Sequence, residues 1–326
     1  MVTTCVGSGT LSERTRVRSV PSAARDDGCV HPSAARAAHP RDRHDLGRGQ
    51  AAALLTDLQR TLLGRFGTSD EQRLDPALRK ARLVVPVRFH VVHGGRSGRL
   101  PKSAVTRQLA TLNAAYGGRK GGADTGVRFR LAGTDWTNKP SWFRDPKRNE
   151  GAMKKRLRKG GRGTLNVFTA AVGTDVLGFS TFPQWYRKNP GRDGVVIDYR
   201  SLPHVAQGPF DRGYTAVHEI GHWLGLLHTF EGGCTPPGDG VADTPYEAQP
   251  AQGCPSGRDT CLQRGLDPVH NFMDYADDAC MREFTAGQGR RIRSAWAAYR
   301  SGGRGHRHVD LGTRTAGAAR SVGGSG

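Results

Sequence analysis

The fold of this chain is decided by the stretch His218-Glu219-Ile220-Gly221-His222-Trp223-Leu224-Gly225-Leu226-Leu227-His228. On a helix, residues four positions apart lie on one face, so His218 and His222 present their imidazoles to one metal ion. Glu219 lies beside them, ready to act on a water molecule held by the metal. Gly225 tolerates a positive φ, which lets the chain leave the helix sharply and return His228 as a third ligand. Three protein ligands plus a water predict a catalytic zinc site rather than a structural one.

Two further segments accompany this stretch, Asp243-Thr244-Pro245 and, downstream of it, Asn271-Phe272-Met273-Asp274-Tyr275. Together with the histidine stretch they resemble the pappalysin-like (cytophagalysin) family of metzincin zinc metalloproteases, because a methionine turn after the histidines belongs to the metzincin signature. The likeness covers roughly residues 80 to 300. The resemblance implies a zinc-dependent endopeptidase that hydrolyses peptide bonds of protein substrates through a zinc-bound water, with Glu219 as the general base.

Two residues of the turn acquire roles only through this resemblance. Met273 would form a hydrophobic floor beneath the metal, and Tyr275 would hydrogen-bond the oxyanion that develops on the scissile carbonyl. Elsewhere in a sequence, a Met and a Tyr are usually core residues. Their position after the histidine motif favours the functional interpretation.

The resemblance also implies where a substrate lies. The run Leu177 to Pro183 is similar to the family's strand at the edge of the sheet, and an extended peptide can pair with such an open edge. Gly178, Phe179 and Ser180 are therefore candidate substrate-binding residues, with an ordinary edge strand as the alternative.

Two acids follow the methionine turn, where this clan commonly builds the wall of the pocket beyond the scissile bond. Asp277 and Asp278 occupy these positions, and Asp278 is the candidate specificity residue. An acidic wall would prefer a basic residue on the primed side of the substrate. Ordinary surface acids are the rival interpretation.

Residues 232–279 are rich in Gly, Pro, Asp and Cys and show almost no periodicity, so something other than a core must hold them. Disulfides meet that need. Four cysteines allow three pairings, and their spacing does not choose among them. The family resemblance favours Cys234 with Cys261 and Cys254 with Cys280.

The same segment carries hard oxygen ligands close together in the sequence. These are Asp239, Asp243, Thr244 and Glu247. Oxygen donors at a loop suit calcium, and the resemblance favours a calcium site over solvated turn acids.

Length and charge limit the remaining possibilities. The 326 residues suit one catalytic domain with flanking tails, and the formal net charge is +20. The Lys and Arg residues are spread along the chain rather than mixed with stacking aromatics, so we expect no specific nucleic-acid partner. A solvated basic surface would still attract acidic substrates or envelope polymers. We expect a monomer that acts on protein or peptide substrates.

Localisation follows from two observations. No stretch approaches the roughly 18 to 20 apolar residues that cross a bilayer. The first fifty residues lack the apolar run of a secretory signal, whereas six cysteines favour an oxidising compartment. We expect a secreted, extracellular protein.

Periodicity predicts an α+β fold with a twisted, mostly parallel sheet and packed helices. The family resemblance implies that this is a metzincin-like zinc protease domain, with backing and active-site helices followed by an irregular, disulfide-linked C-terminal subdomain. Strands are expected at 83–92, 127–131, 165–172 and 195–199, and helices at 50–82, 103–116 and 284–299. The helix at 103–116 begins with Ser103 as a candidate cap, and the last helix with Thr285. We divide the chain into a disordered segment and candidate propeptide at 1–80, a catalytic domain at 81–300 with parts 81–225 and 226–300, and a flexible tail at 301–326.

Several hypotheses stay open. Cys29 in a removable N-terminal segment would act as a thiolate ligand that keeps the zinc site latent, and pairing with Cys5 is the plainer alternative. Two other function classes compete with the protease: a catalytically silent, zinc-stabilised binding protein and a basic nucleic-acid-binding protein.

Overall fold

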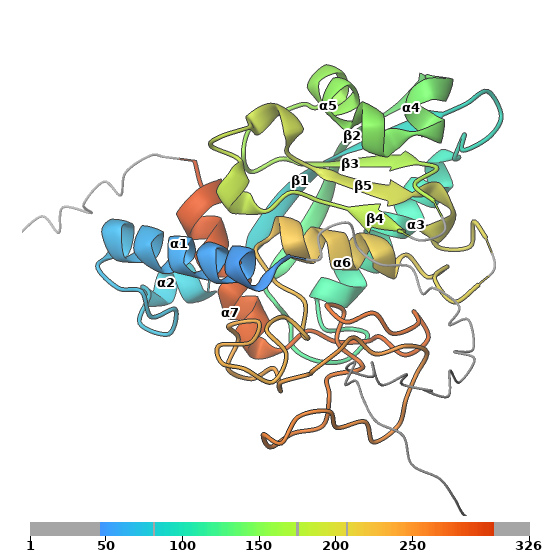
Figure 1. The fold of residues 1–326 in the computed structure, drawn as a ribbon. Coiled ribbons are helices and arrows are strands. Elements are labelled where there is room, and N and C mark those ends of the chain that lie inside the picture. Colours follow the sequence, from blue (N-terminus) through green and yellow to red (C-terminus); the bar gives the residue numbers. More distant parts are fainter. Residues whose placement is uncertain (1–45, 81, 174–175, 207, 303–326) are drawn as a thin grey trace, which may run out of the picture. The chain divides into compact units, whose positions relative to one another are not determined.

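The computed structural model describes residues 46–80, 82–173, 176–206 and 208–302. A five-stranded sheet forms the framework, in the order β2-β1-β3-β5-β4 (Figure 1). Its strands are β1 (Leu83–His93), β2 (Val127–Asn138), β3 (Leu165–Ala170), β4 (Gly178–Phe179) and β5 (Val195–Asp198). β4 pairs antiparallel with β5, and all other neighbours are parallel. This arrangement confirms the predicted mixed, mostly parallel sheet.

Helices lie on both faces of the sheet. They are α1 (Arg48–Phe66), α2 (Pro76–Lys80), α3 (Lys102–Tyr116), α4 (Pro140–Arg144), α5 (Pro146–Leu157), α6 (Tyr214–Trp223) and α7 (Ala286–Ala295). Short 3-10 turns are η1 (Pro183–Trp185), η2 (Pro190–Arg192) and η3 (Tyr199–Ser201), and a π-turn, η4 (Trp296–Arg300), follows α7. Figure 1 shows α4 and α5 above the sheet and α3 and α6 beneath it.

Alternation of apolar residues explains why the sheet separates two cores. Val85, Val87, Phe89 and Val91 of β1 point to one face and pack with α3 and α6. On the other face, Phe168 and Phe179 pack with side chains of α4 and α5. The larger core lies beneath the sheet, between the sheet and α6.

Some elements differ from the prediction. Helix α3 begins after Pro101 and has no side-chain cap, so Ser103 is not the cap that we expected. The short helices α4 and α5 were not predicted, because each starts at a proline and carries few apolar residues. Thr285 does cap α7, and Gln288 completes a capping box.

The segment 1–80, which we expect to be disordered apart from a helix beginning at residue 50, contains α1 and α2. Leu58 and Leu62 of α1 are buried against Ala295 and Ala298, which supplies the apolar surface that a lone helix lacks. The expected helix at 50–82 is also interrupted, since Gly67 ends α1 at φ 72°. Cys5 and Cys29 lie outside the described residues.

Residues 224–285 contain no helix and no strand longer than an isolated bridge. Two disulfides hold this segment, Cys234–Cys261 and Cys254–Cys280. This is the pairing that the family resemblance implies. No described helix is both long enough and apolar enough to cross a membrane.

A buried ion pair ties the C-terminal end of the domain to α6. The guanidinium of Arg300 donates to both carboxylate oxygens of Asp193 at 3.1 and 3.2 Å and stacks on the Trp223 ring at 3.5 Å. The Trp223 indole N–H donates to the same carboxylate at 3.1 Å. Both charged side chains are fully buried. Because Trp223 follows His222 directly, this cluster fixes the end of the helix that carries the histidines.

Replacing Arg300 with Ala tests this link. Loss of the guanidinium leaves Asp193 charged and buried, so we expect the free energy of unfolding to fall by about 3–5 kcal/mol in urea titrations. Arg73→Ala, which removes an exposed ion pair with Asp70, is the control and should cost at most about 1 kcal/mol. Equal small losses in both variants would contradict the structural role of Arg300.

Candidate metal centre and active site

Helix α6 presents the metal-binding residues from a buried position. All ten of its residues are buried, so the helix packs on every side and cannot rotate freely. His218 and His222, one turn apart, point to the same side, and their Nε2 atoms are 3.1 Å apart. The Nε2 atom of His222 is also 3.1 Å from that of His228. These three histidines form one cluster in which the ligand atoms lie within 4.8 Å of one another.

Backbone carbonyls orient two of the imidazoles. Nδ1 of His218 faces the carbonyl of Phe272 at 2.8 Å, and Nδ1 of His222 faces that of Leu226 at 2.8 Å. A neutral imidazole with Nδ1 as donor has its lone pair on Nε2. The lone pairs of His218 and His222 therefore face one another at the centre of the cluster, where a cation would relieve their repulsion. The donor set and spacing fit a zinc ion with Zn–N bonds of about 2.0–2.1 Å.

The turn after α6 follows the predicted geometry. Gly225 has φ 100°, a conformation that favours glycine, and the chain reverses there to bring His228 beneath α6. A Cβ atom at Gly225 would come 2.7 Å from the Cβ of Ala295. Both the positive φ at this position and the close packing against Ala295 therefore require a glycine.

Met273 lies directly under the ligand helix. Its side chain is fully buried, and a Cβ atom added at Gly221 would overlap its sulfur. Gly221 stands between the two histidines of the helix, so the thioether supports the backbone that holds both ligands. The sequence showed Gly221 only as part of the motif, and its packing role becomes visible with the fold.

Glu219 and the edge strand come into close contact. Glu219 is buried, and a Cβ atom at Gly178 would lie 2.7 Å from both Cγ and Oε1 of Glu219. Gly178 therefore leaves the space that this carboxylate occupies. Phe179 and Ser180 are buried, and the Phe179 ring packs on the far face of the sheet. Their side chains do not line the pocket beside Glu219, so a substrate would meet them through the backbone.

Tyr275 reaches the centre from the opposite side. Its hydroxyl lies 3.2 Å from Nε2 of His228, and its ring contacts the rings of His228 and His218. Phe230 stacks on His228 with ring centroids 4.7 Å apart. The aromatic rings limit the orientations that His228 and Tyr275 can adopt.

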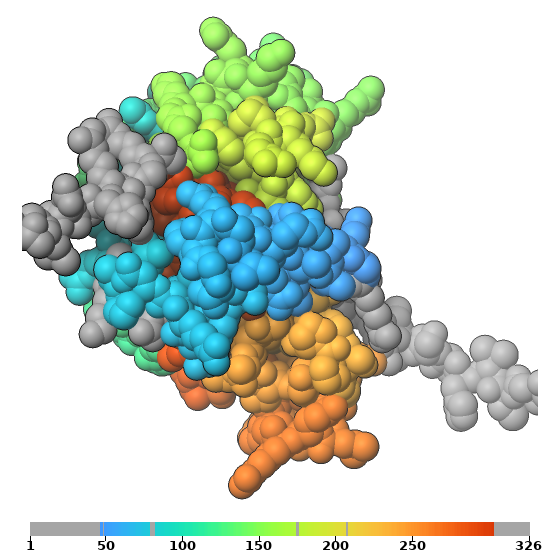
Figure 2. Space-filling view, turned by 90° about the vertical axis from the view of Figure 1, so that its left-hand side faces the viewer, coloured from blue at the N-terminus to red at the C-terminus, as the bar shows by residue number. Residues whose placement is uncertain are grey.

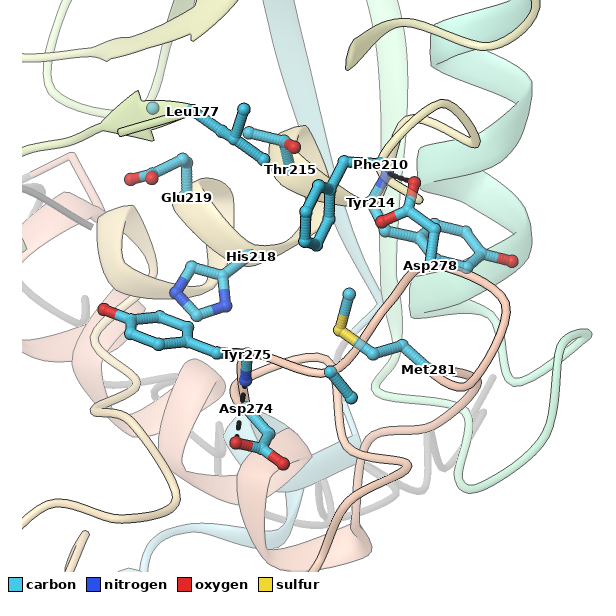
Figure 3. Close-up of a pocket in the computed structure, with 12 residues that line it drawn as sticks. Leu177, Phe210, Tyr214, Thr215, His218, Glu219, Asp274, Tyr275, Asp278 and Met281 are labelled. Atoms are coloured by element: carbon cyan, nitrogen blue, oxygen red, sulfur yellow. Dashed lines mark hydrogen bonds between the residues drawn. The ribbon is translucent and has the colours of Figure 1, made fainter. Parts of the chain in front are cut away.

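A pocket extends from the histidine cluster (Figure 3). Glu219 and His218 lie at one end and Asp278 at the other, with Phe210 and Met281 between them. The remaining lining residues are Leu177, Gly178, Tyr214, Thr215, Asp274, Tyr275 and Ala276. The sequence did not reveal the apolar part of this lining, because Phe210 and Met281 come from loops without periodicity.

Asp278 is the charged group at the end of the pocket. It is 1% exposed, and its Oδ2 accepts a hydrogen bond from the Arg212 backbone N–H at 2.7 Å. Its Oδ1 is buried and has no hydrogen-bond partner among the described residues. Burial raises the pKa of this carboxyl to about 7, although the backbone hydrogen bonds oppose the shift. Asp277, in contrast, is not a lining residue.

The candidate calcium ligands are only partly gathered. Asp239 is buried, its Oδ2 has no hydrogen-bond partner among the described residues, and burial raises its pKa to about 7. The Val241 backbone N–H donates to the other carboxylate oxygen of Asp239 at 2.9 Å, and the buried Thr244 hydroxyl has no hydrogen-bond partner among the described residues. Asp243 instead accepts hydrogen bonds from the Thr285 hydroxyl at 2.8 Å and the Gly287 N–H at 2.7 Å. Its carboxylate therefore stabilises the start of α7.

Glu247 also has other partners. It is fully buried and accepts hydrogen bonds from Thr229 and Arg258. Burial and the nearby Asp274 raise its pKa to about 8. These contacts tie the chain just after His228 to the disulfide-linked segment.

Sequence comparisons find related proteins over most of the chain. The family described as pregnancy-associated plasma protein-A, peptidase M43, matches residues 175–297. An extracellular metalloprotease of Verticillium alfalfae is 47% identical over 231 residues, which are 68% of this chain and 78% of that protein. Extracellular metalloprotease 1 of Coccidioides posadasii is 43% identical, with 68% of this chain and 80% of that protein covered.

Two solved structures share the fold. Mature mirolysin of Tannerella forsythia, in complex with a cleaved peptide, is 29% identical with a TM-score of 0.59, covering 66% of this chain and 92% of its own. A mutant of its precursor, promirolysin, is 26% identical with a TM-score of 0.66, covering 78% of this chain and 93% of its own. The mixed sheet and its helices therefore belong to a known architecture.

The histidine cluster makes a testable prediction about metal content. We expect one zinc per chain in the purified protein by mass spectrometry and almost none in His222→Ala, because the two remaining imidazoles no longer complete the ligand set. A chelator should lower the unfolding temperature of the wild type but not of the variant, since the metal binds the folded state.

His204→Asn serves as the control for this measurement. His204 is exposed and lies outside the cluster, so this variant should keep its zinc. Stoichiometric zinc in His222→Ala would place the metal elsewhere.

Proposed function

The chain belongs to the pappalysin family of metalloproteases, and from this premise we propose that it is a zinc endopeptidase in which Glu219 acts as the general base. The observation that carries the proposal is the convergence of three Nε2 atoms beside a buried carboxylate at the edge of an open strand. A silent zinc-binding protein would have no need of a carboxylate at that place. Zinc, when bound by the three histidines, acidifies water and polarises a carbonyl group.

Glu219 would move the protons of the reaction. Its carboxylate lies at the pocket end nearest His218 and is held close to the backbone of Gly178 (Figure 3). A peptide paired with β4 would pass directly over it. Glu219 would accept a proton from the attacking water and then deliver it to the leaving amine.

Tyr275 would stabilise the oxyanion. Its hydroxyl, 3.2 Å from His228 Nε2, is within reach of a carbonyl oxygen at the centre of the cluster. A hydroxyl that donates to a developing negative charge lowers the barrier more than it strengthens ground-state binding. Met273 would contribute by supporting α6 and would take no part in the chemistry.

The general-base role is tested with Glu219→Gln. We expect this variant to keep its zinc and its unfolding temperature but to cleave a denatured protein substrate about 10²–10⁴ times more slowly, because the amide cannot accept a proton. Retained turnover would remove Glu219 from the mechanism. Zinc in both proteins without cleavage by the wild type would favour the silent binding protein instead.

The pocket beyond His218 supports a preference for a basic residue on the primed side. Asp278 offers a buried oxygen that has no hydrogen-bond partner among the described residues, and the apolar side chains of Phe210 and Met281 line the pocket beside it. A long basic side chain could lay its methylene groups along these walls and place its charge at Asp278. Tyr275 and Glu219 would stand at the mouth of that pocket.

This preference should depend on pH. The carboxyl of Asp278 with a pKa of about 7 is neutral below that pH and charged above it. The ratio of kcat/KM for a peptide with Arg after the scissile bond to that for one with Leu should therefore rise about tenfold between pH 6 and 8, since kcat/KM reports free-enzyme pKa values. Asp278→Asn should give a lower, pH-independent ratio. A ratio that is flat in the wild type would refute the acidic pocket.

We also propose a calcium site in the segment after His228. A buried oxygen of Asp239, which has no hydrogen-bond partner in the described part of the chain, supports a calcium ion beside Thr244, with Asp243 in a structural role. The relatives are named as extracellular proteins, and two disulfides suit the same oxidising location for this chain.

A further inference from the structure

A basic groove lies beside the active-site cleft, between α1 and the segment that follows β4. Its volume is about 1250 Å³. In Figure 2, which faces α1, the yellow-green residues of this segment lie next to the blue helix. The basic side chains that line the groove are Arg60, Arg65, Arg162, Arg187 and Lys188.

The positive charge of the groove is poorly compensated. Asp57 is the one acidic residue among the described lining residues, and it accepts a hydrogen bond from Tyr299 at 2.9 Å and lies 3.9 Å from Arg60. In the part of the chain that the structure describes, Arg187 and Lys188 form no ion pair with an acidic side chain. Like charges gathered in a concave site concentrate their field and attract anions.

The groove lies beyond the C-terminal end of β4, on the side away from the Asp278 pocket. The Phe182 ring lies 5.3 Å from His222, and the Trp185 ring of the groove lies 5.2 Å from Phe182. The Asp278 pocket begins instead at Leu177 and Gly178. The two sites therefore flank the metal centre, one before β4 and one after it.

The direction of a bound peptide follows from strand pairing. A peptide antiparallel to β4 would enter beside residues 183–185 and leave beside Leu177. Its residues before the scissile bond would then lie toward the groove, and those after the bond would lie toward Asp278. This order agrees with the primed-side role proposed for Asp278.

We propose that the groove is an exosite for an acidic stretch of a protein substrate, located several residues before the scissile bond. The inference rests on the proposed endopeptidase function and adds a substrate class to it. Acidic side chains would pair with Arg187 and Lys188 of the catalytic domain on one wall and, in the chain that keeps α1, with Arg60 on the other. The groove acts on binding and leaves the bond-breaking step unchanged.

The test uses the full-length chain and a pair of fluorogenic peptides. Both contain one cleavable core selected from a peptide library, preceded by a flexible linker and either five Glu or five Gln residues. We expect the Glu peptide to have a KM about three- to tenfold lower with the same kcat, because several exposed ion pairs form. The difference should vanish near 1 M NaCl, where such pairs are screened.

Substitutions of the basic residues test whether the groove causes the difference in KM between the two peptides. Arg187→Gln/Lys188→Gln should bring the KM ratio of the two peptides close to one, and Arg60→Gln should lower it partly. The matched control is Arg119→Gln/Lys120→Gln, which removes the same charge from exposed positions outside the groove and should leave the ratio unchanged. Circular dichroism checks that each variant is folded. A preference that survives Arg187→Gln/Lys188→Gln would overturn the assignment, and so would an equal effect of Glu placed after the core.

A binding measurement separates this proposal from the proposed function. Fluorescence anisotropy with Glu219→Gln protein reports binding of the labelled Glu peptide without cleavage. Groove-dependent binding with no cleavage by the wild type would support the exosite and refute the endopeptidase. Cleavage of both peptides with equal KM would support the endopeptidase and refute the exosite. Heparin binding that requires Arg187 and Lys188, with no discrimination between the peptides, would assign the groove to polysaccharide and overturn the acidic-substrate proposal.

Discussion

The convergence of three imidazole Nε2 atoms, those of His218 and His228 each lying 3.1 Å from that of His222, is the constraint on which the rest of the structure depends. Such an arrangement is repulsive unless a cation occupies its centre, and the rings need rigid support to hold it. The carbonyls of Phe272 and Leu226 provide that support by fixing the protonated nitrogens of His218 and His222. The methionine turn thus serves two purposes, since its backbone orients one ligand and its thioether supports the helix that carries two.

Helix α6 is held in place by buried charged side chains as well as by apolar contacts. Arg300 and Asp193 enclose the indole of Trp223, so the last described turn of the chain fastens the end of the ligand helix. A buried ion pair rarely adds much net stability, but it has a strong geometric preference that apolar packing lacks. At the other end, the buried Tyr116 hydroxyl donates to the Val217 carbonyl at 2.9 Å. Polar contacts therefore fix the helix at both ends.

The sequence was sufficient to predict those structural features that depend on the local spacing of residues. The histidine motif, the positive φ of Gly225 and the strand that became β1 follow from periodicity and single-residue chemistry, and the disulfide pairing came through family resemblance. Features that depend on distant partners were not predictable. The pairing of Asp193 with Arg300 joins positions 107 residues apart, and docking of α1 needs an alanine surface supplied by α7 and η4. The spread of basic residues along the chain suggested a uniformly solvated surface, yet folding brings several of them to one groove.

The basic residues of the groove and the carboxyl group of Asp278 place opposite charges at the two ends of the cleft. An acidic pocket lies at one end of β4 and a basic groove at the other, while the intervening edge strand offers only backbone groups. Backbone pairing alone accepts many sequences and, in principle, either chain direction. A substrate with acidic residues upstream and a basic residue downstream would be favoured at both ends in one direction and repelled at both ends in the other. With the proposed pocket and exosite, charge would select the register and direction of the peptide over Glu219, which the hydrogen bonds of a two-residue strand specify only weakly.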